Sequence, residues 1–154
     1  DKLFLRLRIF GNLLQQGILS KFCKTFGILV EAGVTILESF HLIQRVVDNR
    51  VFELAIKSAS RDIENGVNIS RALKDTDIFP PILIQLMATG EETGEIDNLS
   101  LKAAEYYTKQ VNAIVDRLTS IIEPALIILV GGIVGLIVVV TYLPIFHFGS
   151  ALAQ

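Results

Sequence analysis

Apolar residues recur every three or four positions along most of the first 123 residues, and this spacing predicts amphipathic helices. Glycine, asparagine and proline interrupt the pattern at short intervals, so each helix is expected to end at a nearby turn. No stretch alternates apolar and polar residues as a half-buried strand would. The pattern therefore predicts an all-α fold, an antiparallel bundle of about six helices.

The expected boundaries follow from these interruptions. Thr35 and Glu38 have the spacing of a capping box, and Asn68 or Ser70 is expected to cap a short fourth helix. Gly33, Asn65-Gly66 and Thr93-Gly94 are expected to end helices, because glycine adopts the left-handed conformation easily. The predicted helices cover Leu19 to Ala32, Thr35 to about Val47, the stretch between Asn49 and Asn65, Ile69 to Lys74, Pro81 to Thr93, and the chain from about Ile96.

The fifth and sixth helices each have a predicted core face. In the fifth helix the expected core residues are Ile82, Leu83, Leu86 and Met87. In the sixth helix the expected stripe is Leu99, Ala103, Tyr106, Gln110, Ile114, Leu118 and Ile121. Only Gln110 interrupts that apolar stripe.

The segment from Pro124 to Phe146 differs from everything before it. Its 23 residues carry no charge, and 15 of them are Leu, Ile, Val or Phe. As a helix it would be roughly 35 Å long, enough to cross a hydrocarbon layer of about 30 Å. We therefore expect a transmembrane helix over residues 123–146, entered through a kink at Glu123 and Pro124 because proline cannot continue the helical hydrogen bonds. A very apolar helix in a soluble core is the alternative.

Charge predicts how the chain is oriented. All 14 Lys and Arg residues precede the apolar segment, with Lys102, Lys109 and Arg117 nearest to it. Positive residues favour the cytoplasmic side, so residues 1–122 are expected in the cytoplasm and the C-terminus outside it. The single cysteine, Cys23, is consistent with a reducing compartment.

The expected organisation has four parts. Residues 1–17 form a basic juxtamembrane segment, suited to an anionic membrane surface, to the exit of a preceding membrane helix, or to an ordinary first helix of the bundle. Residues 18–122 form a cytoplasmic helical-bundle domain, followed by the membrane helix and a short extracytoplasmic tail, residues 147–154. Because the chain begins with Asp1, we expect a fragment; a cleaved signal would place the domain outside.

No set of catalytic residues can be assembled from the sequence. Cys23 and His41 fall on helical patterns, and His147 lies beyond the apolar segment, so packing or surface roles are expected for all three. No glycine-rich phosphate-binding motif is present. A net charge of −2 gives no indication of direct nucleic-acid binding. We therefore expect no enzymatic activity and no cofactor.

Four carboxylates lie within the corner between the fifth and sixth helices. Glu95 and Asp97 are expected to stabilise the positive start of the sixth helix, whereas Glu91 and Glu92 lie at the negative end of the fifth. We hypothesise that this acidic corner binds a basic partner surface or a divalent cation. The alternative is an ordinary solvated turn.

Glycines in the apolar segment suggest close helix packing. Gly131 and Gly135 have the spacing G-x-x-x-G, which lets two membrane helices approach closely. We expect packing within one chain or between copies, although glycine is also common in membrane helices.

Several motifs in order resemble one known family. They are FCKTFGILVEAGVTILES, IENGVNISRAL, FPPILIQLMATGEETGEID, and RLTSIIEP followed by the apolar segment and LPIF. Together they cover about residues 18 to 148. This order is similar to the F domain of type II secretion systems, which is shared with the inner-membrane platform protein of type IV pili. One departure is Arg8, near which the family often has proline.

The resemblance implies a function and partners that the residue pattern does not show. It implies the second of two cytoplasmic domains, with the last membrane helix, of a non-enzymatic inner-membrane platform. Such a platform couples a hexameric cytoplasmic assembly ATPase to insertion of pilin or pseudopilin subunits into a filament, and it forms homo-oligomers. The alternative class is a membrane-anchored helical binding or signalling module. Secretion, pilus assembly and DNA uptake are not distinguished by the sequence.

Overall fold

A computed structural model describes the backbone of residues 2–151 and the side chains of residues 11–146. Within residues 2–151 every element is helical, which confirms the all-α prediction. The elements are α1 (Lys2–Glu31), α2 (Ile36–Val46), α3 (Arg50–Glu64), α4 (Ile69–Lys74), α5 (Pro81–Thr93) and α6 (Ile96–Ala151).

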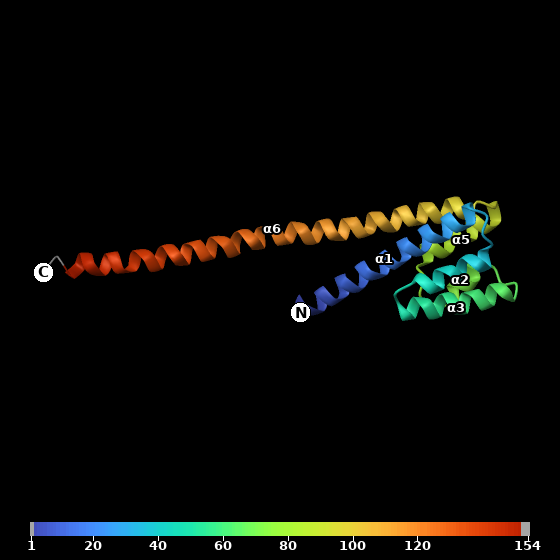
Figure 1. Ribbon diagram of the computed structural model, residues 1–154, viewed down its shortest axis with the longest axis horizontal. Helices are drawn as coiled ribbons and strands as arrows, with labels where there is room; N and C mark the ends of the chain where they lie inside the picture. The colour runs from blue at the N-terminus through green and yellow to red at the C-terminus, as the bar shows by residue number, and fades with distance from the viewer. Residues whose placement is uncertain (1, 152–154) are drawn as a thin grey trace. The chain divides into compact units, whose positions relative to one another are not determined.

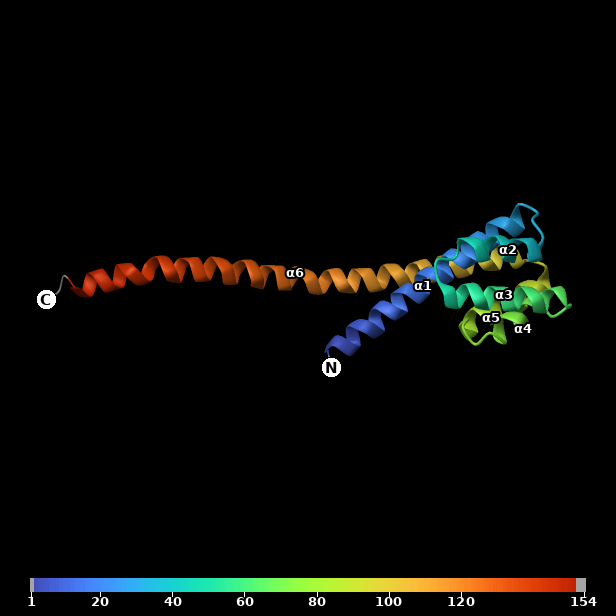
Figure 2. The ribbon, with the colours of Figure 1, turned by 60° about the horizontal axis from the view of Figure 1, so that its bottom comes forward.

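The chain divides into two compact units, residues 1–112 and 113–154, with the boundary inside α6. In the first unit, α2 packs against α1 and α3, and α4 packs against α3 and α5 (Figure 2). Five phenylalanines from four parts of the chain form the centre of its core: Phe22, Phe26, Phe40, Phe52 and Phe79. Such interlocking aromatic contacts specify how the helices meet.

The predicted turns are confirmed at the glycines that end α1, α3 and α5. Gly33, Gly66 and Gly94 have φ values of 85°, 86° and 76°, which a residue with a Cβ rarely adopts. At the start of α2, the Thr35 side chain accepts a hydrogen bond from the Glu38 backbone amide at 3.3 Å. These local signals set most helix boundaries, and α4 covers the predicted residues.

Helix α1 is longer than predicted. It was expected to start near Leu19, but it is continuous from Lys2, so residues 2–17 extend the first helix of the bundle. The reason is that no glycine turn, proline or capping residue separates the two stretches strongly enough to break the backbone hydrogen bonds. Gly11 and Gly17 lie within the helix without ending it.

Two predicted core faces need correction. Tyr107 is 1% exposed, whereas Tyr106, which was predicted to be buried, is 41% exposed. The buried face of α6 consists of Ile96, Ser100, Ala103, Ala104 and Tyr107. The predicted apolar stripe therefore lay beside the buried face. The prediction gave too little weight to small and polar residues, which can also be buried in the core.

In α5, Leu83 and Met87 are fully buried, but Ile82 is 43% exposed and Leu86 is only half-buried. The buried face continues through Gly90, one turn beyond Met87. The predicted core face of α5 was therefore too wide, because it also included Ile82 and Leu86, which flank the buried residues.

Small residues bring α1 and the start of α6 close together. The Ser20 hydroxyl lies 2.7 Å from the Thr108 hydroxyl, and it donates a bond to the Ala104 carbonyl at 3.4 Å. A Cβ added to Gly27 would lie 2.8 Å from Cγ of Leu101. The C-terminal part of α1 and the start of α6 lie next to each other in both views (Figures 1 and 2). The close approach fits the small side chain of Ala104 on the buried face of α6.

The second unit has no buried side chain among residues 113–146. Its helix is long and apolar enough to cross a membrane, with a mean hydropathy of 2.8 and none of the most apolar window buried. This fits the prediction of a membrane helix. The helix is continuous through Pro124 and Pro144, and the bend expected at Pro124 stays a prediction. The tail, residues 147–154, has no described side chains.

Candidate functional site

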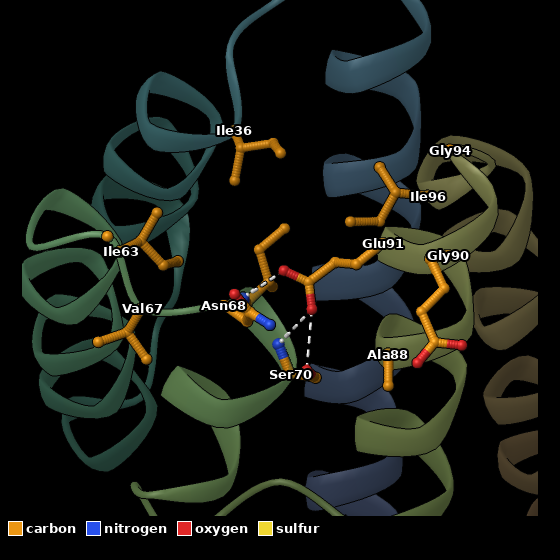
Figure 3. A pocket seen from close by; sticks show the side chains of 13 residues that line it. Ile36, Ile63, Val67, Asn68, Ser70, Ala88, Gly90, Glu91, Gly94 and Ile96 are labelled. Atoms are coloured by element: carbon orange, nitrogen blue, oxygen red, sulfur yellow. Dashed lines mark hydrogen bonds between the residues drawn. The ribbon is translucent and has the colours of Figure 1, made fainter.

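The candidate site is a cleft of about 630 Å³ beside the acidic corner (Figure 3). Its apolar wall comes from the start of α2, the end of α3 and the start of α4, and its polar wall comes from the end of α5. The lining residues include Ile36, Ile63, Val67, Asn68, Ser70, Glu91, Glu92 and Ile96. Sequence reasoning predicted the acidic corner but not the apolar wall, which residues far away in the sequence contribute.

Glu91 reaches across the cleft and binds the start of α4. Its carboxylate accepts hydrogen bonds from the backbone amides of Ile69 and Ser70 and from the Ser70 hydroxyl, the last two at 3.0 and 2.8 Å. Figure 3 shows these bonds joining α5 to α4. A negative charge at the first amides of a helix satisfies otherwise unpaired donors and interacts favourably with the helix dipole.

This geometry corrects two predictions. Asn68 occupies the N-cap position of α4 but makes no side-chain capping bond, and the Ser70 hydroxyl donates to Glu91 and not to the helix backbone. The capping group is therefore Glu91, 21 residues after Ser70 in the sequence. The sequence offered no structural reason for the carboxylate of Glu91 at the negative end of α5. The three hydrogen bonds to α4 supply that reason.

The remaining corner carboxylates are more accessible. Glu92 and Glu95 are exposed, and Asp97 is half-buried in the first turn of α6. Asp97 is thus at the positive end of that helix, where a carboxylate is favourable. Their role as a partner surface stays a prediction.

The structure gives the hypothesised cation site no support. Among the residues whose side chains are described, no three His, Cys, Asp or Glu residues come together as metal ligands. A divalent cation with mainly protein ligands needs several oxygens at one point, and Glu91 already uses both of its oxygens for α4.

The other potentially reactive side chains are Cys23, Tyr107, His41 and His147. Cys23 is fully buried, and burial raises the pKa of its thiol far above the ordinary value, which opposes formation of a nucleophilic thiolate. Tyr107 is also buried, and desolvation raises the pKa of its phenol. His41 lies 3.4 Å from Glu64 on the surface, and the side chain of His147 lies outside the described residues.

Gly131 and Gly135 have open surroundings. A Cβ at either position would meet no heavy atom within 4 Å, apart from the helix's own backbone. No contact within the described residues therefore requires a glycine at either position. Their role in packing stays a prediction.

One signal in the sequence could have identified the role of Glu91. A carboxylate in the last turn of a helix is unfavourable unless a donor approaches it. Pairing that carboxylate with the uncapped start of α4 required knowing that α4 packs beside α5, which only the tertiary structure shows.

Comparisons with known proteins agree with this architecture. Residues 22–144 match the family model described as type II secretion system (T2SS), protein F. Over 152 residues the chain is 36% identical to the type IV pilus assembly protein PilC of Myxococcus xanthus, a match covering 99% of this chain and 36% of that protein. It is 35% identical to the protein transport protein HofC homolog of Escherichia coli, over 99% of this chain and 38% of the relative.

A secretion protein is also among the relatives. The type II secretion system protein F of Pseudomonas aeruginosa is 28% identical over 92% of this chain, which corresponds to 35% of its own length. The chain thus spans little more than a third of the relatives named here. The family match covers the bundle from α1 onward and most of the apolar helix. This chain therefore belongs to the type II secretion system protein F family.

Proposed function

We propose that this chain is part of a non-enzymatic platform in the bacterial inner membrane. In this role it couples a cytoplasmic hexameric assembly ATPase to insertion of pilin or pseudopilin subunits into a filament. The carrying observation is that a folded helical bundle and a charge-free, fully exposed helix share one continuous element, α6, within a chain of this family. A continuous helix can transmit force between two environments, which a flexible linker cannot.

The proposed orientation places the bundle in the cytoplasm and the C-terminus on the other side. Support comes from Lys102, Lys109 and Arg117, which precede the apolar segment while no Lys or Arg follows it. The proposed contact for the assembly machinery is the exposed part of the acidic corner, Glu92 and Glu95, with Asp97 beside them. In this account Glu91 builds the corner and does not contact the partner.

The membrane helix is proposed to pack against sibling helices in a homo-oligomer. The open surroundings of Gly131 and Gly135 support this, because a neighbouring backbone could approach there without displacing any side chain. Replacing both glycines with isoleucine in the full-length protein is expected to shift the oligomer distribution in detergent toward smaller species. An unchanged distribution would contradict the proposal.

The decisive experiment uses the full-length protein in its own cell. We expect E92K combined with E95K to lower filament assembly at least tenfold and to reduce recovery of the assembly ATPase with the protein, at unchanged protein abundance in the membrane. D75K is the matched control, since Asp75 is exposed at the end of α4. Normal assembly in the double variant would overturn the acidic corner as the contact.

Deleting the gene tests the wider function independently. Loss of filaments or of secretion supports the platform. Normal assembly with an altered signalling response would favour the membrane-anchored binding or signalling module.

A further inference from the structure

A second, more apolar groove lies on the first unit, away from the acidic corner. It has a volume of about 600 Å³ and lies between α1 and the end of α2. Its apolar lining is Leu13, Leu14, Gly17, Ile18, Val46 and Val47. Leu14 and Val46 at its rim are 61% and 65% exposed. Large aliphatic side chains exposed together around a concave surface are typical of a binding groove.

No contact among the described residues explains Gly17, which lies in this groove. It lies inside α1, where glycine costs about 1 kcal/mol relative to alanine. The helical glycines Gly27 and Gly90 are explained by their neighbours, because an added Cβ would lie 2.8 Å from Leu101 and 2.9 Å from the Ile96 backbone. At Gly17 an added Cβ would meet nothing within 4 Å. The space above Gly17 is thus available to an external group that approaches the α1 backbone closely.

The charges of α1 indicate which partner fits. The helix contains five Lys and Arg residues and one acidic residue, Glu31 at its end, although the whole chain has a net charge of −2. Lys21 and Asp48 both line the groove, and Lys24 is exposed one turn further along α1. An acidic partner would be attracted to this helix, whereas a basic one would be repelled.

We propose that this groove, between α1 and the end of α2, binds an amphipathic helix of a partner protein. The partner's apolar ridge fills the space over Gly17 between Leu14 and Val46, and carboxylates beside that ridge face Lys21 and Lys24. A concave, aliphatic groove of this size suits a helix ridge, as in other complexes in which a helix lies in a groove. The inference does not depend on the proposed platform function.

The chain contains no tryptophan, so V46W provides a single fluorescent reporter at the rim. The protein is the full chain in nanodiscs of zwitterionic lipid. The probes are two synthetic helical peptides with the same leucine ridge, flanked in one by glutamates and in the other by lysines. We expect the glutamate peptide to shift the emission to the blue and to bind at least tenfold more tightly than the lysine peptide.

Two substitutions in the reporter background test the geometry. G17L places a side chain into the groove and is expected to weaken binding of the glutamate peptide at least tenfold without lowering the melting temperature. K21E with K24E is expected to abolish or reverse the preference for glutamate. The control is G11L, also within α1, where an added Cβ likewise meets nothing but which does not line the groove. It is expected to leave binding unchanged.

Four results would overturn the proposal. One is the absence of any response to the glutamate peptide, and another is equal binding by the G17L variant. A third is quenching of the reporter's indole fluorescence by brominated lipid in the nanodisc, which would show that the bilayer occupies the groove. The fourth is a blue shift that depends on protein concentration without peptide, which would assign the groove to a second copy.

Discussion

The two units of this chain contain the same kinds of apolar side chain in opposite situations. In residues 1–112, Leu, Ile and Phe gather in a closed core and the helices are capped. In residues 119–146, Leu, Ile and Val are exposed around the entire helix, with Ile128 at 74% and Leu136 at 66%. The difference indicates that the first unit is suited to water and the second to an apolar environment. A helix that is apolar all round requires lipid, and an amphipathic one requires a neighbour.

The largest expected effect comes from placing charge in the second unit. I133R combined with V134R should prevent stable membrane insertion, because each arginine near the centre of a span costs about 3 kcal/mol on an insertion scale. Flotation of membranes on a density gradient measures this. T119R, on the exposed part of α6 before the apolar segment, is the control and should float like the unchanged chain. Floating of the double variant would contradict a lipid environment for this helix.

The next largest effect is expected on the stability of the first unit and not on membrane insertion. F26A removes a buried ring that contacts Phe22 and Phe40, and it should destabilise the bundle by about 3–5 kcal/mol. Thermal unfolding followed by circular dichroism measures the loss. Membrane flotation should remain normal. I28A is the control, since Ile28 is 48% exposed on the same helix. Equal effects of the two substitutions would contradict the assigned core.

A smaller effect tests the carboxylate that caps α4. E91Q should destabilise the bundle by about 1–3 kcal/mol, because bonds from backbone amides to a charged acceptor are stronger than those to an amide oxygen. Urea unfolding measures the change, and amide exchange at Ile69 and Ser70 should accelerate.

The neighbouring substitution E92Q provides the matched comparison. Glu92 is exposed, so its change should stay within about 0.5 kcal/mol. If E91Q were as mild as E92Q, the capping role of Glu91 would be wrong.

The smallest effect is a dependence on alkaline pH. Burial raises the pKa of Cys23 in the folded bundle, so above the ordinary value of 9.0 the unfolded chain loses this proton while the folded chain keeps it. The folded state then binds more protons, and stability decreases as pH rises, by about 1.4 kcal/mol per unit for this group. Urea unfolding between about pH 8 and 10 measures the slope.

The variant C23A should reduce that slope without removing it, because burial also raises the pKa of Tyr107. Stability that rises with pH across this range would contradict a buried neutral thiol.

The sequence predicted best what depends on neighbouring residues. The left-handed glycines at 33, 66 and 94 were found because no other residue ends a helix there so readily. The α2 cap was found because Thr35 and its partner are three residues apart. The candidate membrane helix was found because length and composition alone identify such a helix.

Features that depend on tertiary packing were missed. The burial of Tyr107 instead of Tyr106 depends on the tertiary packing of α6, in which Ala104 lies against α1 and Ser100 against Met87 of α5. The capping role of Glu91 depends on a contact across 21 residues of sequence. The open groove over Gly17 depends on where α2 ends relative to α1. Periodicity describes one helix at a time and cannot provide these relations.

The central claim is that α6 leaves water and enters lipid while remaining one helix. Spin labels placed singly at exposed positions along α6, from Lys109 to Tyr142, and read by power saturation in nanodiscs test it most directly. We expect a water-soluble nickel complex to relax the labels before Pro124, and oxygen to dominate the relaxation after it, with a maximum near Val134. Nickel-dominated relaxation at Ile127 to Val140 would contradict the account.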